Sequence, residues 1–398
     1  MIDLKKIVLL AFILVVLSLV LFLESPTPIK AHPANMIVPD DYERIQQAID
    51  RARNGDTIFV RAGLYYENVI VNERVSLIGE NRFNTIIDGN FTGNVIEVAA
   101  DNVTITDFTI QNSGSTPSCG ICVRQRSTGN NISHNIIANN RHGIVLNFDS
   151  EYNSISRNNI RANKECGILL YSSDNDISGN NITDNGKAIW LWDSSDNGIS
   201  ANNITNNWYG ILLEDSSHNT ISGNNITANH WDGINLRRSS SNTIFGNNIT
   251  DNKYGITLYL SSANIICNNN FVDNSEQVLA SRLDSTNVWE DSYPSGGSYW
   301  SDYTGVDVKS GPNQDQTSSD GIGDTPYIID ANNQDRYPLM ISSAPVEEVP
   351  EEKIPFWMQW WFWAIVAVGI VVSAGAVYLK KRKLPNLSLK YLGEQEEP

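Results

Sequence analysis

The sequence predicts an all-β fold, a solenoid of short parallel strands wound into successive turns. Three observations support this prediction. One motif recurs about every 22 residues between residues 117 and 274, and a copy reads Gly-Ile, a strand, a Ser-rich turn, Asn-x-Ile and Asn-Asn-Ile-Thr. Apolar residues alternate within short runs, which excludes helical repeats. A fixed period of this length is typical of solenoids, in which no single unit buries its apolar face alone.

Equivalent positions of successive turns are expected to stack about 4.8 Å apart, the spacing of neighbouring strands. Side chains alternate along a strand, so placing Ile182 inside also places Asn180 inside and Asn181 outside. We therefore expect an inner asparagine column that hydrogen-bonds to the bends and to its own neighbours. The column contains Asn158, Asn180, Asn202, Asn224 and Asn247, and the Gly-Ile step recurs at Gly120, Gly143, Gly167, Ala188, Gly210, Gly233 and Gly255.

Composition excludes one class of partner. The 398 residues carry a net charge of −17, so the chain lacks the basic surface that nucleic acid requires. At the N-terminus, residues 1–31 contain Lys5 and Lys6, followed by an apolar run from Ile7 to Leu23. This pattern predicts a signal peptide, and the length of the run leaves an uncleaved anchor as the alternative.

Residues 37–56 predict an amphipathic helix that starts at Asp40 and ends at Asn54-Gly55. A helix placed there would cover the open core and unpaired edge of the first turn. The solenoid itself is expected over residues 57–286. At the repeat length, that is about ten turns.

The N-terminal motifs resemble the entry to a right-handed parallel β-helix of the pectin-lyase-like class. They are Val38-Pro39-Asp40-Asp41-Tyr42, Gly55-Asp56-Thr57-Ile58, Tyr65-Tyr66-Glu67-Asn68-Val69 and Leu77-Ile78-Gly79-Glu80-Asn81. The repeats that follow resemble those of the NosD family of extracytoplasmic β-helix proteins, also described as carbohydrate-binding and sugar-hydrolase repeats. The resemblance covers about residues 37–341 and implies the fold more firmly than an activity, because this fold hosts lyases, hydrolases, epimerases and binding proteins.

Residues 287–341 resemble the tail that closes many repeat proteins of this kind, and we expect a capping module. Its segment from Asp320 to Asp324 alternates carboxylates with glycine, which suits calcium. The ligand positions of an EF-hand loop are not matched, however, since Gln316 and Ser318 stand where Asp or Asn would be. A plain capping turn is therefore the alternative to a calcium site.

The C-terminal segments predict a membrane anchor. Residues 342–355 are an acidic, Pro-rich stalk, and residues 356–379 are uncharged, with four Trp near their start and Tyr378 near their end. Basic residues open the segment 380–398. This order predicts a single-pass transmembrane helix with a cytoplasmic C-terminus and an extracellular β-helix.

A metal site is the first chemistry to weigh. Cys119, His142 and Cys166 occupy one column on three successive turns. The resemblance to NosD implies copper and a role in nitrous oxide reductase maturation, and thiolates suit Cu(I). Cys119 and Cys166 are two turns apart, about 9.6 Å, which is too far for a disulfide and awkward for one shared ion. Isolated cysteines in a column of turn residues are the alternative.

The sequence also contains candidate sites for the attachment of glycans. Four Asn-x-Ser/Thr triplets are predicted to start outside the solenoid, at Asn181, Asn203, Asn225 and Asn248. Structural repetition alone would also generate them.

The strand after each Gly-Ile step carries residues that could bind sugars. Aromatic rings beside charged groups can stack on sugar rings and bond their hydroxyls. The outward positions predicted to bind glycan are Tyr171, Trp190, Trp192, Glu214, Arg237 and Tyr259. The alternative is an opposite-charge ladder, because Glu214 and Asp215 stack beside Arg237 and Arg238.

The candidate catalytic residues are Asp193 and Asp215, which are expected on adjacent turns with their backbones about 5 Å apart. This is within the range of carboxylate separations in retaining glycosidases. The sequence thus favours a membrane-anchored, cell-surface protein that binds polysaccharide. A polysaccharide lyase or hydrolase and a NosD-like copper-maturation partner remain alternatives, and the sequence does not name the glycan.

Overall fold

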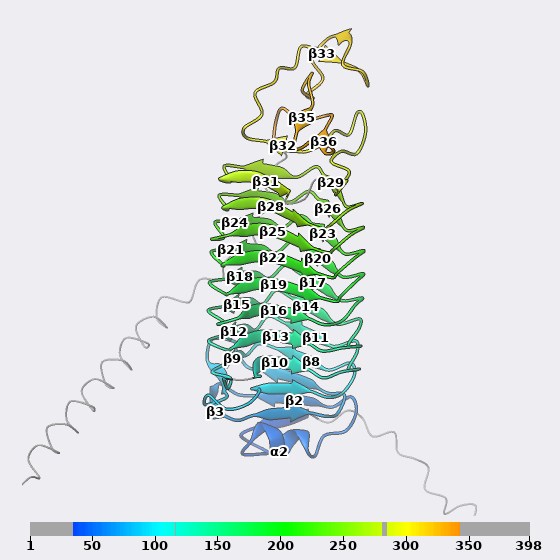
Figure 1. The fold of residues 1–398 in the computed structure, drawn as a ribbon. Helices are drawn as coiled ribbons and strands as arrows, with labels where there is room; N and C mark the ends of the chain where they lie inside the picture. The colour runs from blue at the N-terminus through cyan, green and yellow to red at the C-terminus, as the bar shows by residue number, and fades with distance from the viewer. Residues whose placement is uncertain (1–34, 116, 281–284, 343–398) are drawn as a thin grey trace, which may run out of the picture. The chain divides into compact units, whose positions relative to one another are not determined.

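The computed structural model describes residues 35–342, apart from residue 116 and residues 281–284 (Figure 1). The predicted N-terminal signal or anchor, the transmembrane helix, the cytoplasmic tail and all of the stalk except residue 342 lie outside the described residues. Within the described part of the chain, no helix is long and apolar enough to cross a membrane.

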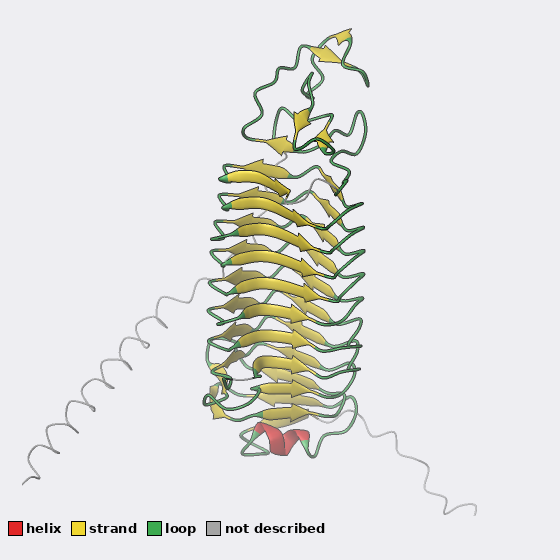
Figure 2. Ribbon diagram, in the orientation of Figure 1, coloured by secondary structure: helices red, strands yellow, loops and turns green. Residues whose placement is uncertain are grey.

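The described residues form a right-handed parallel β-helix of about eleven turns (Figures 1 and 2), which confirms the predicted class. Each regular turn contributes one strand to each of three parallel sheets, here named A, B and C. Sheet A begins earlier than predicted, because β1 (Asn35–Val38) precedes the helix and pairs with β2 (Thr57–Val60).

Sheet A contains β1, β2, β5 (Ser76–Gly79), β8 (Thr104–Thr106), β11 (Asn131–Ser133), β14 (Ser154–Ser156), β17 (Asp176–Ser178), β20 (Gly198–Ser200), β23 (Thr220–Ser222), β26 (Thr243–Phe245) and β29 (Ile265–Cys267). Sheet B contains β3 (Gly63–Tyr66), β6 (Thr85–Asp88), β9 (Thr109–Gln111), β12 (Ile136–Ala138), β15 (Asn159–Arg161), β18 (Asn181–Thr183), β21 (Asn203–Thr205), β24 (Asn225–Thr227), β27 (Asn248–Thr250), β30 (Asn270–Val272) and β32 (Tyr299–Trp300). Sheet C contains β4 (Val69–Val71), β7 (Ile96–Val98), β10 (Cys119–Val123), β13 (His142–Leu146), β16 (Cys166–Leu170), β19 (Lys187–Trp192), β22 (Tyr209–Glu214), β25 (Asp232–Arg237), β28 (Tyr254–Tyr259) and β31 (Glu276–Ala280).

The register follows the repeat. Ile177 pairs with Ile199 in sheet A, and Ile189 pairs with Ile211 in sheet C. All four side chains are fully buried. Aliphatic side chains from the three sheets therefore fill the interior as stacked columns, as the alternation of the sequence predicts.

Asparagine ladders line the bends, and Asn202 shows the pattern. Its Oδ1 accepts from the backbone N–H and the Nδ2 of Asn180 (2.9 and 3.0 Å), and its own Nδ2 donates to the Ile177 carbonyl (2.9 Å). This confirms the predicted inner column, and two further ladders run beside it. One contains Asn130, Asn153, Asn175, Asn197, Asn219, Asn242, Asn264 and Asn287, and the other Asn140, Asn163, Asn185, Asn207, Asn229, Asn252 and Asn274.

The N-terminal helix α2 (Ile45–Ile49) is shorter than the predicted stretch 37–56, and it buries Ile45, Ala48 and Ile49. Asp40 does not cap it, because its carboxylate binds Arg61 (2.7 Å). Instead the Glu67 carboxylate accepts hydrogen bonds from the first two helical N–H groups, at 3.0 and 3.2 Å. A residue one turn further along the chain thus satisfies the helix start.

At the other end, aromatic rings continue the core. Trp300 stacks on Phe271 and on Tyr327, with ring centroids 4.4 and 4.2 Å apart, and Trp289 lies beside it. The buried Asp335 carboxylate accepts from Trp300 Nε1 (2.9 Å) and from the Ser298 N–H (2.8 Å). Two small hairpins complete this region, β33 (Lys309–Ser310) with β34 (Gln316–Thr317) and β35 (Tyr327–Ile328) with β36 (Gln334–Asp335).

Candidate functional site

The outer face of sheet C carries the candidate site because its strands are long. Strands β19, β22, β25 and β28 have six residues each, whereas β20 and β21 of the other sheets have three. A six-residue strand presents several outward positions, which stack into columns. The first column contains Cys119, His142, Cys166, Lys187, Tyr209, Asp232 and Tyr254, the middle column Cys122, Val145, Leu169, Trp190, Leu212, Asn235 and Thr257, and the last column Tyr171, Trp192, Glu214, Arg237 and Tyr259.

One part of this face is an apolar cluster outside the solenoid core. Cys119, Val145, Cys166 and Leu169 point outward yet are at most 7% exposed. Tyr171, Trp190 and Cys122 pack against them. Outward-facing side chains of the first and middle columns are thus buried against one another, so an outward position on this face is not always an exposed one.

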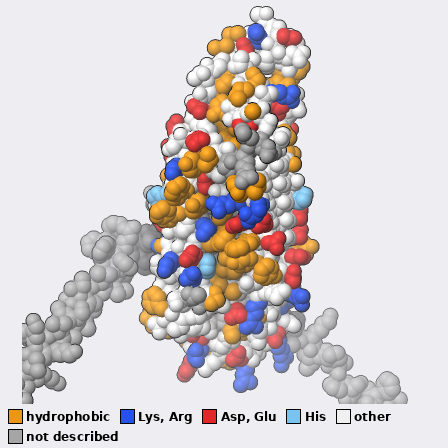
Figure 3. Space-filling model, viewed as in Figure 1, with side chains coloured by type: hydrophobic (Ala, Val, Ile, Leu, Met, Phe, Trp, Pro, Cys, Tyr) orange, Lys and Arg blue, Asp and Glu red, His pale blue; other side chains and the backbone are white. Residues whose placement is uncertain are grey.

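Four rings form an aromatic row along this cluster. Phe148 lies 5.2 Å from Tyr171, Tyr171 lies 6.1 Å from Trp192, and Trp192 lies 5.0 Å from Trp190, between ring centroids. Trp192 is 40% exposed and Phe148 52%. Figure 3 shows this face, where hydrophobic side chains gather next to a band of acidic and basic ones.

Trp190 faces outward, as predicted, but its side chain is less exposed than that of Trp192. It is only partly exposed, packs on the apolar cluster, and has a buried Nε1 without a hydrogen-bond partner among the described residues. Lys187 places its Nζ 4.5 Å from the Trp190 ring centroid. Trp190 thus packs against Trp192. No sequence pattern indicated Phe148, which lies in the bend after β13.

Charged side chains follow the aromatic row along the solenoid. Arg238 Nε and Nη2 bind the two carboxylate oxygens of Asp215 at 2.7 and 2.8 Å, and Nη2 also contacts Glu214 (3.1 Å). The bidentate contact lowers the pKa of Asp215 and raises that of Arg238. Arg237 makes no ion pair or hydrogen bond through its side chain with any described residue. The predicted charge ladder therefore exists, but it uses only one of the two arginines.

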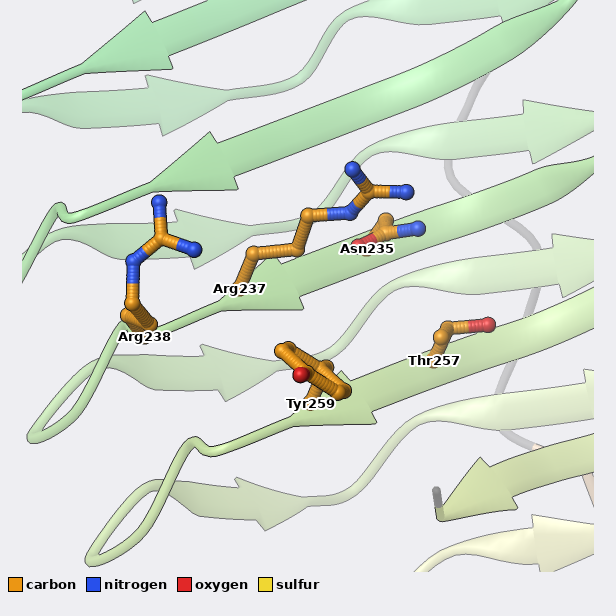
Figure 4. A pocket seen from close by; sticks show the side chains of 5 residues that line it. All are labelled: Asn235, Arg237, Arg238, Thr257 and Tyr259. Atoms are coloured by element: carbon orange, nitrogen blue, oxygen red, sulfur yellow. The ribbon is translucent and has the colours of Figure 1, made fainter. Parts of the chain in front are cut away.

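A shallow cavity of about 340 Å³ lies beside this ion pair (Figure 4). Asn235, Arg237, Arg238, Thr257 and Tyr259 line it, from β25, the bend after it and β28. In Figure 4 the Arg237 side chain runs along its strand toward Asn235, and Tyr259 rises from the next strand. The structure thus brings the predicted Arg237 and Tyr259 together, two turns or more from Trp192.

The two catalytic candidates are adjacent, as predicted. The Asp193 N–H donates to the Glu214 carbonyl (3.0 Å), and both aspartates adopt a left-handed conformation after their strands, with φ of 50° and 51°. The pKa of Asp215 is lowered by its hydrogen bonds to Arg238, however. A carboxyl group that stays ionised cannot serve as the general acid of a glycosidase.

Cys119, His142 and Cys166 do stack in one column. Burial raises the pKa of Cys119, and it raises that of Cys166 to about 12, which disfavours the thiolate that binds metal. A hydrogen bond with Cys119 lowers the pKa of Cys122. Over the described residues, no three or more His, Cys, Asp or Glu side chains come together in a way that could hold a metal ion. These residues therefore do not fit a copper site.

The calcium candidates have structural partners instead. Asp324 Oδ1 accepts from the N–H groups of Val308 and Lys309 (3.1 and 3.0 Å). Asp320 accepts from Gln314 Nε2 and from the Gly311 N–H, both at 3.2 Å. Both carboxylates thus hydrogen-bond within the region that follows the solenoid.

The four predicted glycosylation positions lie outside the core, on consecutive strands of sheet B. They form a fourth, outer ladder, in which each Nδ2 donates to the Oδ1 of the preceding turn: Asn203 to Asn181 (3.1 Å), Asn225 to Asn203 (3.0 Å) and Asn248 to Asn225 (2.9 Å). The amide nitrogen that would carry a glycan is thus a hydrogen-bond donor in three of these positions. The triplets have a structural role that sequence parity alone did not reveal.

Comparisons with solved structures define the class of protein. The enzymatically active domain of tailspike protein 2 from bacteriophage CBA120 aligns with a TM-score of 0.57 and 15% identity, over 72% of this chain and 52% of that one. The full-length tailspike protein 2 from an Escherichia coli O157:H7 bacteriophage aligns with a TM-score of 0.54 and 15% identity, over 73% of this chain and 46% of that one. The chain thus spans about half the length of these tailspike structures, and the likeness is one of fold.

The family follows from the sequence. The model of the family described as periplasmic copper-binding protein (NosD) matches residues 49–219 and 199–305. The chain belongs to this family. No curated protein has a significant sequence match to it.

Proposed function

We propose that this protein is an extracytoplasmic glycan-binding protein and that its binding surface is the outer face of sheet C. The observation that carries the proposal is the aromatic row on the same face as a cavity, two turns further along, that is lined by polar and charged side chains. Sugar rings stack on exposed aromatic rings, and hydroxyl groups bond to neighbouring amide, hydroxyl and guanidinium groups. The periplasmic family description supports a location outside the cytoplasm.

Binding is favoured over catalysis by the ion pair of Asp215 with Arg238. The tailspike domain with the same fold is described as enzymatically active, but the fold does not transfer an activity. Binding is also favoured over copper maturation, although the family description names copper, because no three His, Cys, Asp or Glu side chains of the described residues come together in a way that could hold a metal ion.

Anchoring in the membrane is a further part of the proposal. It rests on the uncharged stretch 356–379 with its aromatic ends and the basic residues that follow. The β-helix would then be presented on the outer side of the membrane, at the end of a short stalk.

A glycan array probed with the purified protein tests the proposal. We expect binding to a limited set of polysaccharides, lost in Trp192→Ala and retained in Trp208→Ala. Trp208 is the matched control, because it is 57% exposed and lies in the bend before β22, near His230 rather than in the aromatic row. Binding that survives in Trp192→Ala, or no binding to any glycan, would refute the proposal.

A further inference from the structure

We propose that the glycan is acidic and that Arg237 binds its anionic group in the cavity between β25 and β28. This inference rests on the proposed function and names the class of ligand. The argument starts from the charges around the cavity. Glu214 and Asp215 both contact Arg238, which leaves Arg237 as a guanidinium without an ion pair among the described residues.

The strand register alone would pair Arg237, rather than Arg238, with Glu214. Arg237 stands between Glu214 and Tyr259 in its column, so its nearest neighbour in sequence register is a carboxylate. Glu214 nevertheless pairs with Arg238, at 3.1 Å. Arg238 can reach back to the preceding turn because it occupies the left-handed bend position after β25, with φ of 49°. Arg237 lies along the face of the sheet instead (Figure 4).

Asp232 is a further acidic group on β25, and its carboxylate is already hydrogen-bonded. Asp232 is 5% exposed, and its two carboxylate oxygens accept from Thr257 Oγ1 (2.5 Å) and Asn235 Nδ2 (2.6 Å). It presents little of its carboxylate to solvent. The cavity therefore offers a guanidinium fork to a ligand, and such a fork matches carboxylate, sulfate or phosphate oxygens in pairs.

The cavity and the aromatic row are close enough along the solenoid for one glycan chain to contact both. Trp192 pairs with Glu214, and Glu214 pairs with Arg237, so Trp192 and Arg237 are two turns apart. At the strand spacing, this is about 9.6 Å, the scale of a disaccharide. A chain lying along the solenoid axis could stack one sugar on Trp192 and place the anionic group of a nearby sugar on Arg237. The net charge of −17 repels polyanions in general, so binding of one would require a specific site.

The test measures affinity for three polymers: polygalacturonate, its carboxyl-reduced neutral form, and dextran sulfate. We expect the full-length protein to bind at least one anionic polymer roughly tenfold or more tightly than the neutral one. Arg237→Gln should lower that affinity roughly tenfold, equivalent to about 1.4 kcal/mol, and leave binding of the neutral polymer unchanged. The preferred anionic polymer then distinguishes a carboxylate from a sulfate. Arg161→Gln is the matched control, because Arg161 is exposed on β15 of sheet B, and it should change neither affinity.

Several outcomes would overturn the inference. One is equal affinity for the neutral and anionic polymers, and another is tighter binding of the neutral polymer, as expected if the Asp232 charge dominates. A third is an equal loss of affinity for the anionic polymer in Arg237→Gln and Arg161→Gln. If Trp192→Ala abolishes binding while the wild-type protein does not discriminate, the acidic class fails and the proposed function stands. If Trp192→Ala leaves binding intact, both fail. If none of the three polymers binds, the acidic class fails, and the glycan array decides the proposed function.

Discussion

Replacing Asn202 by Ala tests whether the inner asparagine ladder holds the turns together. The substitution removes the Oδ1 acceptor of the Asn180 N–H and the Nδ2 donor of the Ile177 carbonyl. Asn202 is 1% exposed, so water does not replace these partners without a rearrangement. A buried polar group that loses its partner costs about 1–3 kcal/mol, and two such groups give an expected loss of about 2–6 kcal/mol in the free energy of unfolding.

Asn203→Ala is the matched control, one residue along the chain. Asn203 belongs to the outer ladder, where it donates to Asn181 and accepts from Asn225. Its side chain is partly exposed, so water can take over both contacts, and we expect a loss within about 1 kcal/mol. Urea unfolding followed by circular dichroism measures both. Equal losses in the two variants would refute the assignment of inner and outer ladders.

Three further predictions concern separate parts of the chain. Burial raises the pKa of Asp335 from 3.8 to about 6, so its contribution to stability is fully present below pH 3.8 and is lost as the pH rises to about 6. The lost contribution amounts to about 3 kcal/mol, and Asp335→Asn should remove this part of the pH dependence in urea unfolding. An unchanged profile would contradict it. Trp190→Ala should lower the thermal midpoint, because Trp190 packs on the apolar cluster, whereas Trp192→Ala should leave it nearly unchanged; equal midpoints would contradict the packed position of Trp190. Protease added to intact cells should release a fragment that ends near residues 343–355, and cleavage of the tail beyond residue 384 with a protected β-helix would reverse the proposed orientation.

The fold was accessible from the sequence because its repeat is strict. Side-chain parity placed Ile182 and Asn180 inside and Asn181 outside, and all three positions agree with the observed stacking. The capping of the N-terminal helix was harder to predict from the sequence. Glu67 reaches it from the following turn and replaces the expected cap Asp40, a partner choice that local sequence signals do not contain.

The sequence predicted which residue types form the candidate site, but not which of them are exposed or how they pair. Parity placed Trp190 and Trp192 on the same side, but it could not indicate that the apolar cluster covers most of Trp190. Likewise, charge order predicted a ladder of two acidic and two basic residues. Which arginine takes both carboxylates depends on the backbone conformation of Arg238, a feature of the bend that the alternation of strands does not specify.

The most direct test of the binding face is oxidative footprinting of the protein with and without a bound polysaccharide, read by mass spectrometry. The account predicts that the glycan protects Trp192, Tyr171 and Tyr259, which share the last column of sheet C. Trp208 and Trp231, exposed at 57% and 37% in the bends before this sheet, should keep their oxidation rates. Protection of Trp208 or Trp231 without protection of Trp192 would contradict the account.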